Sequence, residues 1–404
     1  MWAWGGVAMG GPTPNQAGSI LNRAILAILV IVISAHGADA RTWNVRKDGT
    51  GDYTVIQDAV DHAASGDTIK IGPGRYEEKR PFSSYPVDTA EKWTFDVFVA
   101  VTVSDLTIIG AGADQTVIGW PTTLGGGPDQ PKIICALSRV SRLVVEDLAL
   151  ENVFNGIYRS ERGTLEVRRC RTSGCLYGIT TWSELSTVVE DCYFEDIDYG
   201  VISYYPARNL NVSQCEFVAC AAAFEHTTNA IVADCSFDQY PVGCQFANNS
   251  SGSIYSCTFT DQTNVGINVV TGSVVNLIGN QVSGSAVNLR LRTAATVTGW
   301  DNVFCGGSNS TIFSSNGIVE LHGCQILHGA GPTVKVDAFV YPPIRILDLT
   351  NNYWGTDSEE TIAGWILDYQ DDATVNAKVE FEPFQGQPVA LEPESWGNLK
   401  ALFR

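Results

Sequence analysis

Aromatic, acidic, amide and basic residues recur through the middle of the chain at intervals of 20 to 23 positions. The set consists of Trp182, Tyr204, Glu225, Gln245, Asn268, Asn288 and Arg290. Aromatic faces stack on sugar rings, and amides or charges fix hydroxyl groups, so these residue types are typical of a carbohydrate-binding surface. An ordinary solvated sheet face is the alternative, because strand-forming residues would occur there as well.

Glu225 is the member of this set that we predict to be catalytic. Hydrolysis of a glycosidic bond uses two carboxyl groups about 5 to 9.5 Å apart. Glu161 and Glu184 are the candidate partners, from turns one to three repeats away. Elimination from a uronate sugar would instead use a base such as Arg290 or Arg292, with a cation neutralising the acid group.

A repeat must place these residues on one face. The pattern apolar-x-apolar-x-x-Cys-x-apolar of residues 143–150 and 165–172 returns every 20 to 23 residues. Its key position is occupied by Leu148, Cys170, Cys192, Cys215, Cys235, Cys257, Asn280, Asn302, Cys324 and, after a longer interval, Asn352. Two residues later come Phe194, Phe217, Phe237 and Phe259, and small residues follow eight positions after the key: Gly156, Gly178, Gly200, Ala223 and Gly243, with Gly266 one step later.

A period near 22 with apolar alternation predicts a solenoid of three short strands per turn. Its coils stack at about 4.8 Å, so equivalent side chains form internal columns, including a stack of phenylalanine rings. Alternation places Ile157, Ile179, Val201, Phe224, Cys244, Ile267 and Val287 inward and the set above outward. Arg159 falls on the inward phase, which we interpret as a strand end or a register error, and His226 is expected to point inward.

The repeat, completed by a glycine and an apolar residue, resembles that of right-handed parallel β-helices of the pectin-lyase-like superfamily. The resemblance covers about Val45 to Phe384 and implies an all-β fold of ten or more coils. It implies no single activity, because the superfamily includes lyases, hydrolases, esterases and non-enzymes. The opening, residues 45–56, is similar to that of pectinesterases, but the catalytic motifs of pectinesterases, polygalacturonases and pectate lyases are absent, so no catalytic residue is carried over.

The resemblance and the local patterns divide the chain into five parts. Residues 1–40 are a predicted signal peptide, with Arg23 before an apolar run and Ala38-Asp39-Ala40 as the cleavage site. Residues 41–78 form a cap with a helix over 55–64, begun by Thr54, and the first coil. Residues 79–354 are coils with loop insertions, 355–384 a cap with a helix over 359–369, and 385–404 a tail. Trp354 and Trp365 are expected in the core of this cap.

The net charge of −19 argues against a nucleic-acid partner, whose phosphates need clustered Lys and Arg. It also makes an anionic polysaccharide an awkward partner unless a cation or a local basic patch intervenes. The eleven cysteines of an exported chain would usually indicate disulfides. Six lie in one inward column and are expected to be free, whereas Cys170 with Cys175 and Cys215 with Cys220 are the disulfide candidates.

Metal ligands are sparse. His322, Cys324 and His328 lie close in sequence, but Cys324 belongs to the buried column, so we predict no metal there. Asp371 and Asp372 could hold Ca²⁺, the one cofactor we consider.

Together these patterns predict a secreted, periplasmic or cell-surface monomer with no integral membrane segment after signal cleavage. We expect it to bind polysaccharide and to process it if it is an enzyme, as a lyase or a glycoside hydrolase. A non-catalytic structural or surface interaction protein is the alternative hypothesis.

Overall fold

The computed structural model describes residues 40–84, 93–122, 131–136, 140–160, 162–182, 185–337 and 344–388. Residues 1–41 form one unit and residues 42–404 a second, which is the subject below. The predicted signal peptide lies outside the described residues except for Ala40, as do Glu161, Glu184 and most of the predicted tail. No described helix is long and apolar enough to cross a membrane.

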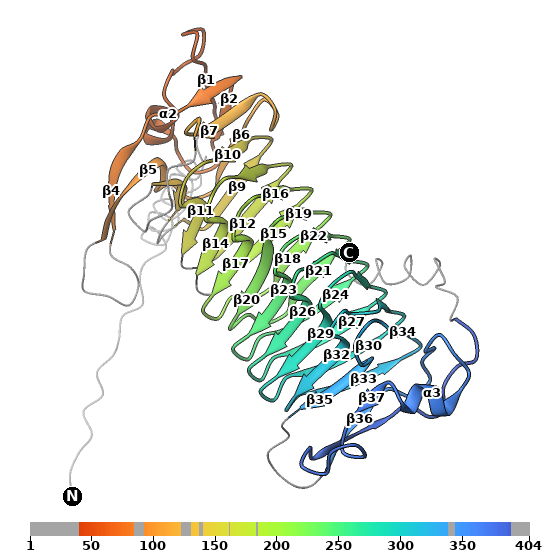
Figure 1. The fold of residues 1–404 in the computed structure, drawn as a ribbon. Helices are drawn as coiled ribbons and strands as arrows, with labels where there is room; N and C mark the ends of the chain where they lie inside the picture. Colours follow the sequence, from red (N-terminus) through yellow and green to blue (C-terminus); the bar gives the residue numbers. More distant parts are fainter. Residues whose placement is uncertain are drawn as a thin grey trace, which may run out of the picture. The chain divides into compact units, whose positions relative to one another are not determined.

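Three sheets make up the described part of the second unit, and each regular turn of the chain adds one strand to each sheet (Figure 1). In the described residues sheet A has 14 strands, sheet B 11 and sheet C 13. Neighbouring strands are parallel except for β4 and β5 in sheet C, which form an antiparallel pair. The chain is therefore a parallel β-solenoid, and the predicted all-β fold is confirmed.

Sheet A contains, in spatial order, β1 (Thr42–Val45), β2 (Thr68–Ile71), β6 (Leu106–Ile109), β9 (Arg142–Glu146), β12 (Gly163–Arg168), β15 (Leu185–Glu190), β18 (Leu210–Ser213), β21 (Ala230–Ala233), β24 (Ser251–Tyr255), β27 (Val274–Ile278), β30 (Thr296–Trp300), β33 (Ile318–His322), β36 (Arg345–Asp348) and β38 (Ala377–Glu380). Sheet B contains β3 (Gly74–Tyr76), β7 (Thr116–Gly119), β10 (Ala149–Glu151), β13 (Arg171–Ser173), β16 (Tyr193–Glu195), β19 (Glu216–Val218), β22 (Ser236–Asp238), β25 (Thr258–Thr260), β28 (Gln281–Ser283), β31 (Val303–Cys305) and β34 (Gln325–Leu327). Sheet C contains β4 (Arg80–Ser84), β5 (Trp93–Val101), β8 (Lys132–Ala136), β11 (Asn155–Ser160), β14 (Tyr177–Trp182), β17 (Tyr199–Tyr204), β20 (Ala221–Glu225), β23 (Val242–Ala247), β26 (Val265–Val270), β29 (Val287–Arg292), β32 (Ser310–Ser315), β35 (Val334–Asp337) and β37 (Ile366–Leu367).

The turn from sheet A to sheet B explains the spacing of the repeat. The residue before each key position has a positive φ, as at Asp191 (54°), Gln214 (55°) and Asp234 (55°). A left-handed residue reverses the chain sharply there, and Asp, Asn and Gly tolerate this conformation best. The next residue, the cysteine or asparagine, is thereby directed into the core.

The predicted phenylalanine column is confirmed. The rings of Phe194, Phe217, Phe237 and Phe259 stack with successive centroid distances of 5.0, 4.5 and 4.7 Å. The rings also explain the glycines that lie beside them, Gly178, Gly200 and Gly243. A Cβ atom on Gly200 would lie 2.7 Å from the Phe217 ring, so only glycine fits at that position.

The side chains at the key position of the repeat form a second column, which contains both cysteines and asparagines. Its cysteines are buried and their thiols lie against backbone carbonyls, as for Cys235 Sγ and Val212 O at 3.6 Å. Farther along, the amide of Asn280 accepts from the backbone N–H of Cys257 (2.9 Å) and donates to the carbonyl of Ile254 (2.8 Å). All eleven cysteines lie among the described residues and are free. The two predicted disulfide candidates are therefore wrong, because the two thiols of a pair lie against different backbone carbonyls, as for Cys170 Sγ with Arg168 O (3.3 Å) and Cys175 Sγ with Ser173 O (3.6 Å).

Two helices lie at the ends of the described solenoid. The first, α2 (Ile56–His62), packs its buried residues beside β5 and begins at Val55 without a side-chain cap, so the predicted start at Thr54 is wrong. The second, α3 (Glu359–Ala363), is capped by Ser358, whose Oγ accepts from the N–H of Thr361 (3.2 Å). The predicted extension to residue 369 is wrong, because Ile366 leaves the helix and pairs with Val334 in sheet C.

The predicted burial of the C-terminal tryptophans is confirmed. Trp354 is fully buried, and Trp365 packs against the core with its ring stacked on His328.

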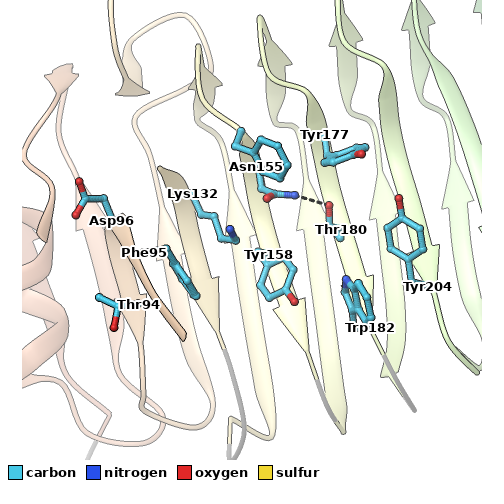
Figure 2. Close-up of a pocket in the computed structure, with 11 residues that line it drawn as sticks. Thr94, Phe95, Asp96, Lys132, Asn155, Tyr158, Tyr177, Thr180, Trp182 and Tyr204 are labelled. Atoms are coloured by element: carbon cyan, nitrogen blue, oxygen red, sulfur yellow. Dashed lines mark hydrogen bonds between the residues drawn. The ribbon is translucent and has the colours of Figure 1, made fainter. Parts of the chain in front are cut away.

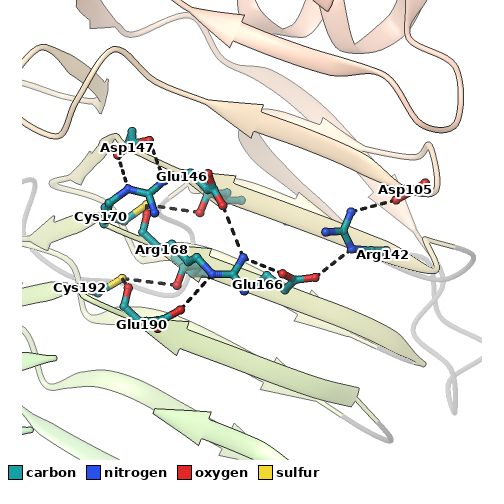
Figure 3. Close-up of polar contacts among 12 residues, drawn as sticks. Asp105, Arg142, Glu146, Asp147, Glu166, Arg168, Cys170, Glu190 and Cys192 are labelled. Atoms are coloured by element: carbon teal, nitrogen blue, oxygen red, sulfur yellow. Dashed lines mark hydrogen bonds and ion pairs between the residues drawn. The ribbon is translucent and has the colours of Figure 1, made fainter. Parts of the chain in front are cut away.

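The outer face of sheet A carries a network of ion pairs (Figure 3). Arg142 pairs with Asp105 and Glu166, and Arg168 with Glu166 and Glu190, at 2.7 to 3.1 Å. Exposed pairs of this kind contribute little stability individually, although a network contributes more than isolated pairs. Each of these arginines therefore has an internal carboxylate partner.

Candidate functional site

The outer face of sheet C carries the predicted site residues other than Asn288, in two rows rather than one. Trp182 pairs with Tyr204 across neighbouring strands, whereas Gln245 pairs with Asn268 and Asn268 with Arg290. The register shifts between β17 and β20, where Val201 pairs with Ala222. Gln245 therefore lies in the row that contains Tyr158, Thr180 and Ile202. On each strand this row lies two residues before the row that contains Trp182 and Tyr204.

Three aromatic rings form a platform on β14 and β17. The Trp182 ring lies 5.2 Å from the Tyr204 ring and 5.7 Å from the Tyr205 ring, measured between centroids. Tyr205 is 55% exposed, so the platform has an open edge. The Tyr205 ring stacks on Trp182 and the Tyr204 ring is tilted against it, and these partly exposed rings offer an apolar surface to a ligand.

A groove of about 750 Å³ begins at this platform and extends over β14, β11, β8 and β5 (Figure 2). This volume is in the range of small-ligand sites. Its lining residues are Thr94, Phe95, Asp96, Lys132, Phe154, Asn155, Tyr158, Tyr177, Thr180, Trp182 and Tyr204. Of the predicted site residues, the groove therefore brings together Trp182 and Tyr204 and none of the others.

Lys132 is the cation of the groove. Its Nζ lies over three rings, at 4.4 Å from the centroid of Phe95, 5.3 Å from Tyr158 and 5.4 Å from Phe154. The side chain is 9% exposed, and burial lowers its pKa from the ordinary value for lysine. Cation–π contacts offset part of the cost of burying the charge. No described carboxylate forms an ion pair with it, and the groove carboxylate Asp96 pairs with Lys79.

The hydroxyls of Tyr158 and Tyr204 stay protonated at neutral pH. Burial raises the pKa of Tyr158, and burial together with the neighbouring Tyr177 raises that of Tyr204. Beside them, the amide of Asn155 donates to the hydroxyl of Thr180 at 2.7 Å. These groups can donate or accept hydrogen bonds with sugar hydroxyls, but they are poor bases.

Glu225 lies at the end of β20, beyond the groove. Its Oε2 accepts a hydrogen bond from Nδ2 of Asn248 at 3.3 Å. Both predicted partner carboxylates, Glu161 and Glu184, lie outside the described residues. Hydrolysis by Glu225 therefore remains a prediction from the sequence.

The second row forms a hydrogen-bonded ladder. Arg290 donates from Nε to Oδ1 of Asn268 at 2.9 Å, and Asn268 donates from Nδ2 to Oε1 of Gln245 at 2.7 Å. Asn268 is only 4% exposed, so the ladder holds Arg290 in a defined position.

The comparison with known families agrees with this architecture. The family described as "Right handed beta helix region" matches residues 134–253, which contain the platform and three of the four stacked phenylalanines. The chain is a right-handed parallel β-helix protein. No curated protein matches its sequence.

Several solved structures are similar to the β-helix. They include the catalytic unit of a GH87 α-1,3-glucanase from Streptomyces thermodiastaticus strain HF3-3 (12% identity, 88% of this chain, 71% of that chain, TM-score 0.45). The mannuronan C-5 epimerase AlgE4 A-module of Azotobacter vinelandii has 13% identity over 82% of this chain and 94% of that chain, with a TM-score of 0.37. Pectin methylesterase from carrot has 12% identity over 92% of this chain and 97% of that chain, with a TM-score of 0.30. At these values the likeness bears on neither substrate nor activity.

Asn288 does not lie on the outer face of the β-helix, so its predicted orientation is wrong. The flanking pairs Val265 with Val287 and Ile267 with Leu289 place it opposite Gly266, at the small-residue position. It is fully buried, and its amide donates to backbone carbonyls of Val282 (3.3 Å) and Cys305 (3.1 Å).

Two further orientations differ from expectation. Arg159 is not out of register, because it pairs with Thr181, and it lies one residue before the end of β11. It is fully buried and donates to the backbone carbonyls of Val140, Ser160 (3.0 Å) and Arg162 (3.0 Å). His226 is exposed rather than inward, because its φ of 50° turns the chain and brings its ring 6.4 Å from Tyr205.

The sparse metal ligands have other contacts. Nδ1 of His322 lies 2.9 Å from the carbonyl of Thr350, and His328 stacks on Trp365 with 4.3 Å between centroids. Asp372 accepts from the N–H of Thr374 at 2.9 Å within a turn. Within the described ranges no group of three or more His, Cys, Asp or Glu is placed to hold a metal ion. Calcium at Asp371 and Asp372 stays a prediction.

The groove contains residues that the sequence analysis missed. Asn155, Tyr177 and Lys132 share one pairing position, directly before the small residue of the repeat in the first two cases. The position before the small residue could have marked these groove residues in the sequence, because aromatic or amide residues occupy it in successive repeats. Phe95 gave no such signal, because β5 lies outside the regular repeat.

Proposed function

We propose that this β-helix is an exported protein that binds polysaccharide in the groove on sheet C. The observation that carries the proposal is the platform of Trp182, Tyr204 and Tyr205 at the end of a groove lined by further aromatic rings. Aromatic faces with a few hydrogen-bonding groups beside them are the usual means of holding sugar rings. The signal-peptide pattern of residues 1–40 supports export.

Binding is the function that the described geometry supports best. The described lining of the groove holds one carboxylate, Asp96, which is already paired with Lys79. Processing of the bound chain, by Glu225 or by another group, is the second candidate. A surface interaction protein without carbohydrate affinity is the alternative from a different class.

A polysaccharide panel separates these functions. Purified protein is mixed with each glycan, and the unfolding temperature and the release of reducing or unsaturated ends are measured. A raised unfolding temperature without new ends supports binding alone, and new ends that vanish with Glu225→Gln support catalysis. If no glycan changes either signal, the carbohydrate proposal is wrong.

A further inference from the structure

Arg290 and Arg292 form a cationic pair on the outer face of sheet C, outside the groove. They lie two residues apart on β29, so both side chains leave the same face. The contacts that the described residues give them are neutral: Asn268 accepts from Nε of Arg290 at 2.9 Å, and the guanidinium of Arg292 lies 5.6 Å from the centroid of Phe313. No described carboxylate forms an ion pair with either arginine.

This pair differs from the arginines of the ion-pair network on sheet A. There Arg142, Arg168 and Arg169 each have two or more carboxylate partners (Figure 3). The chain has 44 acidic residues against 25 basic ones, so carboxylates are plentiful. Two guanidiniums on one strand, neither with a carboxylate partner among the described residues, therefore offer a place where an anionic ligand can bind.

Arg290 is also held by a hydrogen bond in a position in which it can bind a ligand. The Asn268 contact fixes its Nε edge, and Asn268 is itself held by Gln245 at 2.7 Å. In the described part of the chain the two terminal nitrogens of Arg290 have no hydrogen bond. Burial, with a further effect of Arg292, lowers the pKa of Arg290 to about 10. A bound anion would favour the charged guanidinium and so offset both the burial of Arg290 and its repulsion by Arg292.

We propose that Arg290 and Arg292 bind a carboxylate or sulfate group of a glycan that lies along sheet C, which makes the ligand an acidic polysaccharide. Guanidinium groups match the planar, two-oxygen edge of such anions. The inference rests on the proposed function, because the groove supplies the aromatic contacts to the same chain. Lys132 lies seven strands away from Arg290, at about 34 Å, so one extended glycan would meet cations at both ends.

Other charges on this face limit where the anion lies. Lys335 follows Arg290 in its row, two strands on. Asp337 follows Arg292 in the same way, and Glu225 lies nearer the groove. The anion is therefore expected over β29 and β32, on the Arg290 side.

Three dextrans with one backbone test the site. Neutral dextran, carboxymethyl dextran and dextran sulfate are titrated by calorimetry into wild-type protein and into the double variant Arg290→Gln/Arg292→Gln. We expect the double variant to bind the charged dextrans about tenfold or more weakly, the effect of losing charge-assisted hydrogen bonds. The carboxymethyl and sulfate arms show which anion is preferred. Arg345→Gln, an exposed arginine of sheet A, is the matched control.

A second variant guards against misfolding. Asn268→Asp places a carboxylate beside Arg290 and should weaken binding of the charged dextrans while leaving the unfolding temperature close to that of wild type. Unchanged affinity in the double variant, or no binding of either charged dextran by wild type, overturns the proposal. Trp182→Ala separates the proposed groove from the proposed anion site. If Trp182→Ala loses binding and the double variant does not, the groove proposal stands and the anion-site proposal is wrong. If the double variant loses binding and Trp182→Ala does not, the anion-site proposal stands and the groove proposal is wrong.

Discussion

At the residue scale, the aromatic platform and Lys132 carry the functional account. Trp182 contacts both Tyr204 and Tyr205, so removing its ring dismantles the platform without opening the core. We expect Trp182→Ala to weaken glycan binding about tenfold or more, as truncation of a central aromatic anchor does. Calorimetric titration with the best glycan of the panel measures the change. Trp300→Ala, which removes a tryptophan that is 43% exposed on sheet A, is the control and should bind as wild type does.

Lys132 gives a prediction about pH. Burial lowers its pKa, so the unfolded chain holds this proton more tightly than the folded protein does. The folded state therefore gains stability from this group as the pH rises toward about 10.4, the ordinary lysine value. We expect the free energy of unfolding of wild type to rise relative to Lys132→Met over that range, measured by urea denaturation at several pH values. A difference that stays constant or falls would contradict this, and Lys70→Met, at an exposed lysine of β2, is the control.

At the element scale, the internal columns hold the coils in register. Phe237 lies between Phe217 and Phe259 in the stack, so its truncation leaves a cavity lined by two rings. We expect Phe237→Ala to lower the free energy of unfolding by about 3 to 5 kcal/mol, and Phe237→Leu to lower it by less. Chemical denaturation of both variants checks the order. Equal losses for the two would mean that the stack does not pack as described.

The columns could be predicted because the repeat interval fixes which side chains coincide. The stack of Phe194, Phe217, Phe237 and Phe259 and the inward cysteines follow from spacing alone. The orientation of Asn288 could also have been predicted from spacing, because it lies eight residues after Asn280, at the small position of its repeat, opposite Gly266. The early end of α3 depends on the tertiary pairing of Ile366 with Val334.

The site was predictable only in part. Trp182 and Tyr204 occupy a regular row, so alternation places them outward together. Lys132 and Phe95 meet in the groove because β5 and β8 pair with the regular coils, and no local pattern marks that pairing. The exposure of His226 depends on a left-handed residue, which apolar alternation does not reveal.

At the scale of the whole molecule, the described solenoid is held without covalent links between coils. All eleven cysteines are free, and burial raises the pKa of thiols such as Cys324 to about 12, which keeps them protonated and unreactive. We expect a strong reductant to leave the unfolding temperature unchanged within a degree or so, measured by differential scanning calorimetry. A large decrease would show that disulfides stabilise the protein after all.

The central claim is that a polysaccharide lies on the outer face of sheet C. Hydroxyl-radical footprinting, read by mass spectrometry with and without a saturating amount of the best glycan, tests it most directly. The account predicts slower oxidation of Trp182 and Tyr204 in the complex, while Trp300 on sheet A reacts at an unchanged rate. Protection of Trp300 with no protection of Trp182 and Tyr204 would contradict it.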